Sequence, residues 1–210
     1  MKVKNIKLLI FDLDGVLINS KNNMSISWKI LSKENKLNIH FREYFKKIEL
    51  PIKQILSELG IKKNQNTLEK QYFRNSLKYK NKIKPYKHVY KILIKLQKKY
   101  LLSIVTSKRK KNSVIYTKQF FPKVKFSLIC SPRKNIRSKP FPDQFNYTFK
   151  KLKVSAKNAI YVGDMVHDFT AAKRAKTNFI LAKYGYLNKK IKTNYAIDNI
   201  KGLEKILKRF

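Results

Sequence analysis

Four aspartates occupy two short segments that each follow an apolar run. They are Asp12 and Asp14 after KLLIF, and Asp164 and Asp168 after AIYV. The chain has only 12 acidic residues against 50 Lys and Arg, so this crowding is notable. Each aspartate alone is more typical of a turn or a helix cap. Together, carboxylates this close repel one another unless a cation with oxygen preference, such as Mg²⁺, holds them ionised.

Two further polar segments follow apolar runs or lead into a helix. Thr106, Ser107 and Lys108 come directly after LLSIV, and Lys139 lies in the loop before the Phe145 region. Ligands of parallel α/β sheets bind at the carboxyl ends of the strands. If the apolar runs are parallel strands, these side chains and the four aspartates gather at one edge of the sheet.

The elements that must position these residues alternate between two periodicities. Five apolar runs of strand length are KLLIF at 7–11, LLSIV at 101–105, FSLIC at 126–130, AIYV at 159–162 and NFIL at 178–181. Helical spacing separates them, as in the stripe that includes Val89, Ile92 and Leu96. Alternating strands and helices predict right-handed crossovers and an α/β fold with an open parallel sheet, a Rossmann-like core.

The stretch 21–84 differs, because it contains helical patterns without a convincing strand. Met24, Trp28 and Leu31 form one stripe, and a second lies over 52–59 between Pro51 and Gly60. Pro at a helix start and Gly after a helix end are typical helix boundaries. We therefore expect a Rossmann-like core at 1–20 and 85–210, with an α-helical cap at 21–84 inserted after the first strand.

The segments FDLDGVLINS, VTSK, SKPFPD and YVGDMVHDF resemble, in order and spacing, the four motifs of haloacid dehalogenase superfamily hydrolases. The resemblance is nearest to the phosphoglycolate phosphatase-like branch, whose helical cap is inserted just after the first motif. It covers essentially the whole chain, with specific motifs and a weakly matching cap. It implies a magnesium-dependent phosphatase that hydrolyses a small phosphomonoester. The low cysteine content agrees with a reducing cytoplasm, where we expect the enzyme.

The resemblance also implies roles for individual residues. Asp12 would attack phosphorus and form an aspartyl-phosphate, and Asp14 would act as general acid and base. Asp12, the Asp14 backbone carbonyl and Asp164 would bind Mg²⁺, and Asp168 would either hold these ligands in place or bind the metal through a water molecule. The remaining implied roles are phosphoryl binding by Thr106, Ser107 and Lys139.

Other activities stay open at this point. Dehalogenases of the superfamily lack an aspartate at the position of Asp14, because a carbon–halogen bond needs no leaving-group proton. Mutases of the β-phosphoglucomutase type share the motifs and the cap, so a phosphomutase is the main alternative. The net charge of +38 suggests a third possibility, a nucleic-acid-binding protein. The basic residues are spread along the chain without a clustered aromatic face, so we expect no specific nucleic-acid partner.

The remaining sequence features concern membrane spans, the single cysteine, His167 and the oligomeric state. No apolar stretch approaches the roughly 20 residues that cross a bilayer, so we expect no membrane partner. A single cysteine, Cys130, excludes an internal disulfide and is expected in the core. We expect His167 to face solvent at the rim of the site. No strong stripe on the predicted surface requires a second copy of the chain to cover it, so we expect a monomer.

Overall fold

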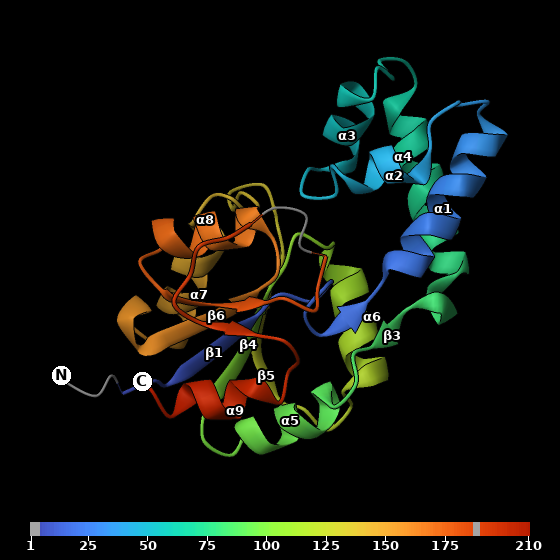
Figure 1. Cartoon of the computed structure of the whole chain (residues 1–210). Coiled ribbons are helices and arrows are strands. Elements are labelled where there is room, and N and C mark those ends of the chain that lie inside the picture. The colour runs from blue at the N-terminus through green and yellow to red at the C-terminus, as the bar shows by residue number, and fades with distance from the viewer. Residues whose placement is uncertain (1–4, 187–189) are drawn as a thin grey trace. The chain divides into compact units, whose positions relative to one another are not determined.

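The computed structural model describes residues 5–186 and 190–210 (Figure 1). These residues divide into two compact units. The sheet unit contains the residues up to Ile18 and from Pro85 onward, and the helical unit is Asn19–Lys84. Each unit has a hydrophobic core of its own. The sheet unit is therefore assembled from two chain segments, with the helical unit as an insertion between them.

A six-stranded parallel sheet forms the centre of the sheet unit, in the order β5-β4-β1-β6-β7-β8. Its strands are β1 (Leu8–Phe11), β4 (Leu101–Val105), β5 (Phe126–Cys130), β6 (Ala159–Gly163), β7 (Asn178–Ala182) and β8 (Ala196–Ile197). Strand β1 is buried along its whole length, as a central strand covered on both faces should be. The predicted open parallel sheet is confirmed. The short strand β8 is an addition that the apolar runs did not indicate.

Helices cover both faces of this sheet. They are α5 (Val89–Leu96), α6 (Lys110–Phe120), α7 (Asp143–Leu152), α8 (Val166–Arg174) and α9 (Gly202–Leu207), with a 3-10 turn at Ala156–Asn158. Helices α7 and α8 lie on one face, and α5 and α9 lie on the other (Figure 1). On the first face, Phe145 of α7 and Ala171 of α8 share a core cluster with Ile10 and Tyr161. This packing fixes both helices against the strands that end in aspartates.

The helical unit contains α1 (Lys21–Glu34), α2 (Phe41–Phe45), α3 (Ile52–Glu58), α4 (Gln65–Lys78) and a 3-10 turn at Lys80–Lys82. Trp28 is completely buried there and stacks on Tyr44, with ring centroids 4.5 Å apart. A two-residue ribbon of β2 (Ile18–Asn19) and β3 (Lys84–Pro85) lies where the chain passes between the units. Among the described helices, none combines the length and apolar character that a membrane span requires.

Candidate active site

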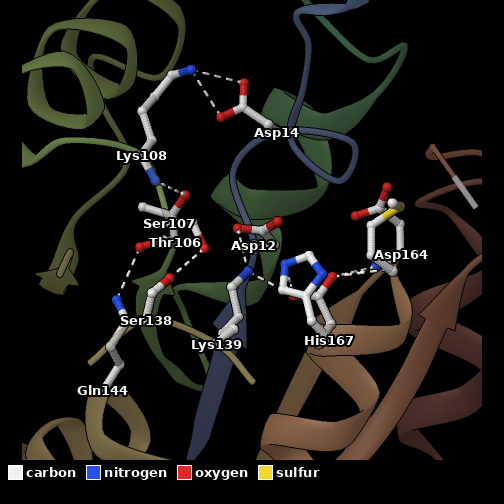
Figure 2. Close-up of polar contacts among 12 residues, drawn as sticks. Asp12, Asp14, Thr106, Ser107, Lys108, Ser138, Lys139, Gln144, Asp164 and His167 are labelled. Atoms are coloured by element: carbon white, nitrogen blue, oxygen red, sulfur yellow. Dashed lines mark hydrogen bonds and ion pairs between the residues drawn. The ribbon is translucent and has the colours of Figure 1, made fainter. Parts of the chain in front are cut away.

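The sheet topology gathers the predicted residues at the carboxyl ends of three neighbouring strands. Strand β1 lies between β4 and β6 in the sheet. Asp12 follows β1, Thr106 follows β4, and Asp164 follows β6. Thr106 therefore lies on one side of Asp12 and Asp164 on the other (Figure 2). This is the edge at which parallel α/β sheets bind their ligands.

Lys139 lies at the centre of the polar contacts. Its Nζ atom is 3.1 Å from Asp12 Oδ1, and it donates hydrogen bonds to Asp168 Oδ1 at 2.6 Å and to the Tyr161 hydroxyl at 3.0 Å. The Lys139 side chain has no exposed surface. An ammonium group buried without anionic partners would be very costly, so these contacts are needed to keep it charged. The predicted phosphate-binding lysine thus reaches the predicted nucleophile.

Asp168 is saturated with hydrogen bonds. Besides the contacts with Lys139, its Oδ1 accepts from the Tyr161 hydroxyl at 2.8 Å, and its Oδ2 accepts from the backbone N–H groups of Asp164 and Met165, both at 3.0 Å. A carboxylate has about four acceptor positions, and all are used here. Asp168 therefore holds Lys139 and the loop that carries Asp164.

Asp164 has one anchored oxygen and one bare oxygen. Its Oδ2 accepts a hydrogen bond from the Tyr186 backbone N–H at 2.6 Å. Its Oδ1 is buried and has no hydrogen-bond partner among the described residues. Gly15 and Gly185 pack so closely against this side chain that a Cβ atom at either position would collide with it. The surrounding backbone thus fixes the carboxylate while one of its oxygens stays available.

Burial and neighbouring charges shift the pKa values of the three buried aspartates in different directions. Burial raises the pKa of Asp12 to about 6, although the Lys139 ammonium opposes that shift. Burial, together with the charges of Asp168 and Asp12, holds the pKa of Asp164 well above its usual range. For Asp168, burial acts in the same direction, but the charges of Lys139 and His167 and the hydrogen bonds from Lys139 and the Met165 backbone together outweigh it, so the pKa of Asp168 lies below the usual range. The buried Lys139 ammonium therefore contacts two of these three carboxylates, those of Asp12 and Asp168.

A divalent cation fits this surplus of negative charge. Oxygen atoms of Asp12, Asp164 and Asp168 lie within 4.8 Å of one another, and all three residues are buried. Because the oxygens of Asp168 are already occupied, the bare Asp164 Oδ1 and the Asp12 carboxylate are the available ligands. Hard oxygen donors of this kind suit Mg²⁺. The donor set therefore fits the predicted metal.

Asp14 is placed apart from this cluster. The Lys108 ammonium contacts both of its oxygens, at 3.1 Å from Oδ1 and 2.9 Å from Oδ2, and both side chains are about one-sixth exposed (15% and 16%). The Lys108 ammonium also lies 5.4 Å from the centroid of the Tyr116 ring. From the sequence, Lys108 is expected only at the end of a strand, without a defined partner. The structure instead pairs it with the predicted general acid and base.

The two predicted hydroxyl donors differ in their environment. The Thr106 side chain is buried, and its Oγ1 accepts a hydrogen bond from the Lys108 backbone N–H at 3.2 Å. Gln144 of α7 donates to the Thr106 carbonyl at 2.9 Å and thereby fixes the end of β4. Ser107 is exposed, and its hydroxyl lies 2.8 Å from the Ser138 hydroxyl (Figure 2). Thr106 is therefore the more rigidly held of the two.

His167 is less exposed than expected, and two contributors to the site were missed. The His167 side chain is only 10% exposed and lies with Nε2 3.8 Å from Asp168 Oδ1, because α8 turns it toward the cluster. Tyr161 looked like one member of an apolar strand, although its hydroxyl within that run was a usable signal. Tyr186 contributes through its backbone N–H, which no residue type indicates. Cys130 is a buried free thiol, as predicted.

Comparison with known proteins agrees with this geometry. A family model described as haloacid dehalogenase-like hydrolase matches residues 9–182. The pyrophosphatase PpaX of Oceanobacillus iheyensis is 25% identical over 95% of both chains, and the phosphoglycolate phosphatase of Aquifex aeolicus is 27% identical over 86% of both. A solved haloacid dehalogenase-like hydrolase from Streptococcus pneumoniae superposes with a TM-score of 0.82. It is 19% identical, and the match covers 99% of this chain and all of the other.

Proposed function

The chain belongs to the haloacid dehalogenase-like hydrolases, and on that premise we propose that it is a magnesium-dependent phosphatase acting on a small phosphomonoester. One observation carries the proposal. The buried Asp12 carboxylate lies 3.1 Å from the Lys139 ammonium, beside an Asp164 oxygen without a hydrogen-bond partner among the described residues. A nucleophile, a cation for the phosphoryl group and a metal ligand are therefore adjacent.

In the first step, an Asp12 oxygen forms a bond to phosphorus while the bond from phosphorus to the leaving oxygen breaks. Asp14 donates a proton to that leaving oxygen. In the second step, Asp14 takes a proton from water, which attacks phosphorus and releases Asp12 and inorganic phosphate. Splitting one displacement into two lowers the barrier of each.

Positive charge and hydrogen-bond donors surround the phosphoryl group in both steps. Lys139 would neutralise its oxygens, and Thr106 and Ser107 would donate through hydroxyl and backbone N–H groups. Mg²⁺, held by Asp12, Asp164 and the Asp14 carbonyl, would supply further positive charge next to these oxygens. Asp168 would keep Lys139 and Asp164 in place through the hydrogen bonds described above.

The presence of Asp14 supports phosphoryl transfer over dehalogenation. Phosphate esters of poor leaving groups need a proton on the departing oxygen, which a carboxyl group at this position supplies. The two curated relatives are named for pyrophosphate and phosphoglycolate, both of which release a small anionic leaving group. We therefore propose a small anionic phosphometabolite as the substrate.

The proposal is tested by phosphate release from a panel that includes phosphoglycolate, pyrophosphate, sugar phosphates and p-nitrophenyl phosphate. We expect wild-type activity that requires Mg²⁺ and disappears on addition of EDTA. The variant Asp12→Asn keeps the shape of the side chain and should lose activity by about 10⁴-fold or more. Equal phosphate release by wild type and Asp12→Asn on every substrate would refute the proposal. Conversion between sugar phosphate isomers without net phosphate release would point to a phosphomutase.

A further inference from the structure

The hydroxyl of Tyr161 joins Lys139 to Asp168 at the bottom of the site. It accepts a hydrogen bond from Lys139 Nζ at 3.0 Å and donates one to Asp168 Oδ1 at 2.8 Å, while Lys139 and Asp168 contact each other directly at 2.6 Å. All three side chains are buried. The roles of donor and acceptor are unambiguous, because an ammonium group only donates and a carboxylate only accepts.

We propose that Tyr161 is a positioning residue that directs the Lys139 ammonium toward the phosphoryl group of the substrate. The inference rests on the proposed phosphatase function and adds to it Tyr161, a residue of the segment YVGDMVHDF to which the resemblance assigns no role. Tyr161 lies on β6, two positions before Gly163, and in register with Ile10 of β1. It does not contact the reacting atoms itself and acts through Lys139.

The geometry of the ammonium group explains why such a residue is needed. Lys139 lies in the loop between β5 and α7 and reaches the site through a long side chain with four rotatable bonds. Its nitrogen carries three N–H groups. Asp168 and Tyr161 accept from two of them, and these two contacts hold the nitrogen 3.1 Å from Asp12 Oδ1, beside which the phosphoryl oxygens would lie.

The aromatic ring of Tyr161 is itself held in place. It packs edge-on against Phe145 of α7 with centroids 4.8 Å apart, and it lies 6.1 Å from the ring of Phe179 on β7. A ring fixed on a central strand and wedged between two other rings presents its hydroxyl at one fixed point. The sheet thereby determines the position of a charge that is carried by a loop.

The variant Tyr161→Phe tests the inference because it removes only the hydroxyl. Inorganic phosphate binding is measured by calorimetry at saturating Mg²⁺, together with kcat and KM. A lost hydrogen bond to a charged group should weaken phosphate binding about 10-fold to 100-fold, with a comparable fall in kcat/KM. Mg²⁺ affinity should stay within about twofold of wild type, because the Asp164 ligand keeps both of its backbone contacts.

Tyr116→Phe is the matched control. The Tyr116 side chain is also buried, but its hydroxyl has no hydrogen-bond partner among the described residues, so phosphate binding should not change. A double-mutant cycle with Lys139→Met then identifies the route of the effect. If Tyr161 acts through Lys139, adding Tyr161→Phe to Lys139→Met should cause no further loss.

Three results would overturn the inference. The first is unchanged phosphate binding in Tyr161→Phe, and the second is an equal loss of binding in the Lys139→Met background. The third is a fall in Mg²⁺ affinity that matches the fall in phosphate affinity, which would assign the effect to the metal site. Failure of the proposed function is separate, because it would leave wild type itself without activity that depends on Asp12.

Discussion

Lys108 and Asp14 form an ion pair in which one ammonium group contacts both carboxylate oxygens, at 2.9 and 3.1 Å. Lys108 follows β4 and Asp14 follows β1, so the pair joins the ends of two neighbouring strands. Asp14 would have to reach the leaving oxygen in the proposed reaction. Lys108 therefore fixes the carboxylate on which proton transfer would depend.

We expect Lys108→Met to lower kcat by about 10-fold, because a misplaced general acid and base loses part of its catalytic contribution of about 10²-fold to 10⁴-fold. Stability should change by less than about 1 kcal/mol, since a partly exposed ion pair contributes little. Steady-state kinetics and urea unfolding measure the two effects. Lys111→Met on the exposed side of α6 is the control. Equal kcat values for both variants would contradict a role for the ion pair.

Burial of Asp12 predicts that the metal-free protein loses stability as pH rises. The pKa of Asp12 is raised from 3.8 to about 6, so the folded state binds more protons than the unfolded state between these values. The unfolding free energy then falls with rising pH in this window, by on the order of 3 kcal/mol for this group. Below about pH 3 both states are protonated and the effect is absent.

Urea unfolding in EDTA at pH 4, 5, 6 and 7 measures this dependence. Asp12→Asn cannot titrate at this position, so its unfolding free energy should fall less than that of wild type over the same range. The difference between the two proteins should develop between pH 4 and 6 and then level off. Parallel pH profiles for the two proteins would show that Asp12 titrates normally.

Metal binding should release protons. Burial raises the pKa of Asp12 to about 6 and holds that of Asp164 well above its usual range, and a metal ligand must be ionised. We therefore expect Mg²⁺ affinity to increase by about 10-fold or more from pH 5.5 to pH 7. Calorimetry in buffers with different ionisation enthalpies measures the protons released. Asp164→Asn should weaken binding strongly, and an affinity that is independent of pH would contradict the prediction.

Gly185 should be required for metal binding because it has no Cβ atom. A Cβ atom there would collide with the Asp164 carboxylate and would lie 2.5 Å from the Gly15 carbonyl oxygen. Gly185→Ala must therefore displace Asp164 or its loop, and we expect Mg²⁺ affinity to fall by about 10-fold to 100-fold, as for other changes around metal ligands. Gly202→Ala introduces the same methyl group against Ile197 of β8 and serves as the control. If Gly185→Ala and Gly202→Ala bind Mg²⁺ with equal affinity, the loop around Gly185 accommodates the methyl group and the prediction is wrong.

All five predicted runs became strands, and the central ones could be predicted because burial on both faces requires continuous apolar runs. Helix α4 had no comparable signal. Its contact with α1 includes a polar pair, in which Ser76 Oγ donates to Asn23 Oδ1 at 2.8 Å and Asn23 Nδ2 donates to the Ser76 carbonyl at 2.9 Å. Apolar periodicity does not detect polar residues on a buried face.

The sequence by itself determined which residues would meet, because Asp12, Thr106 and Asp164 each follow a strand and parallel strands end at one edge. Only the tertiary structure decided how they pair. Lys139 contacts Asp12 and Asp168, Lys108 contacts Asp14, and one oxygen of Asp164 has no hydrogen-bond partner in the described part of the chain. The reason is physical: residue order fixes the strand ends, whereas hydrogen bonds depend on distances and directions set by packing across the whole sheet.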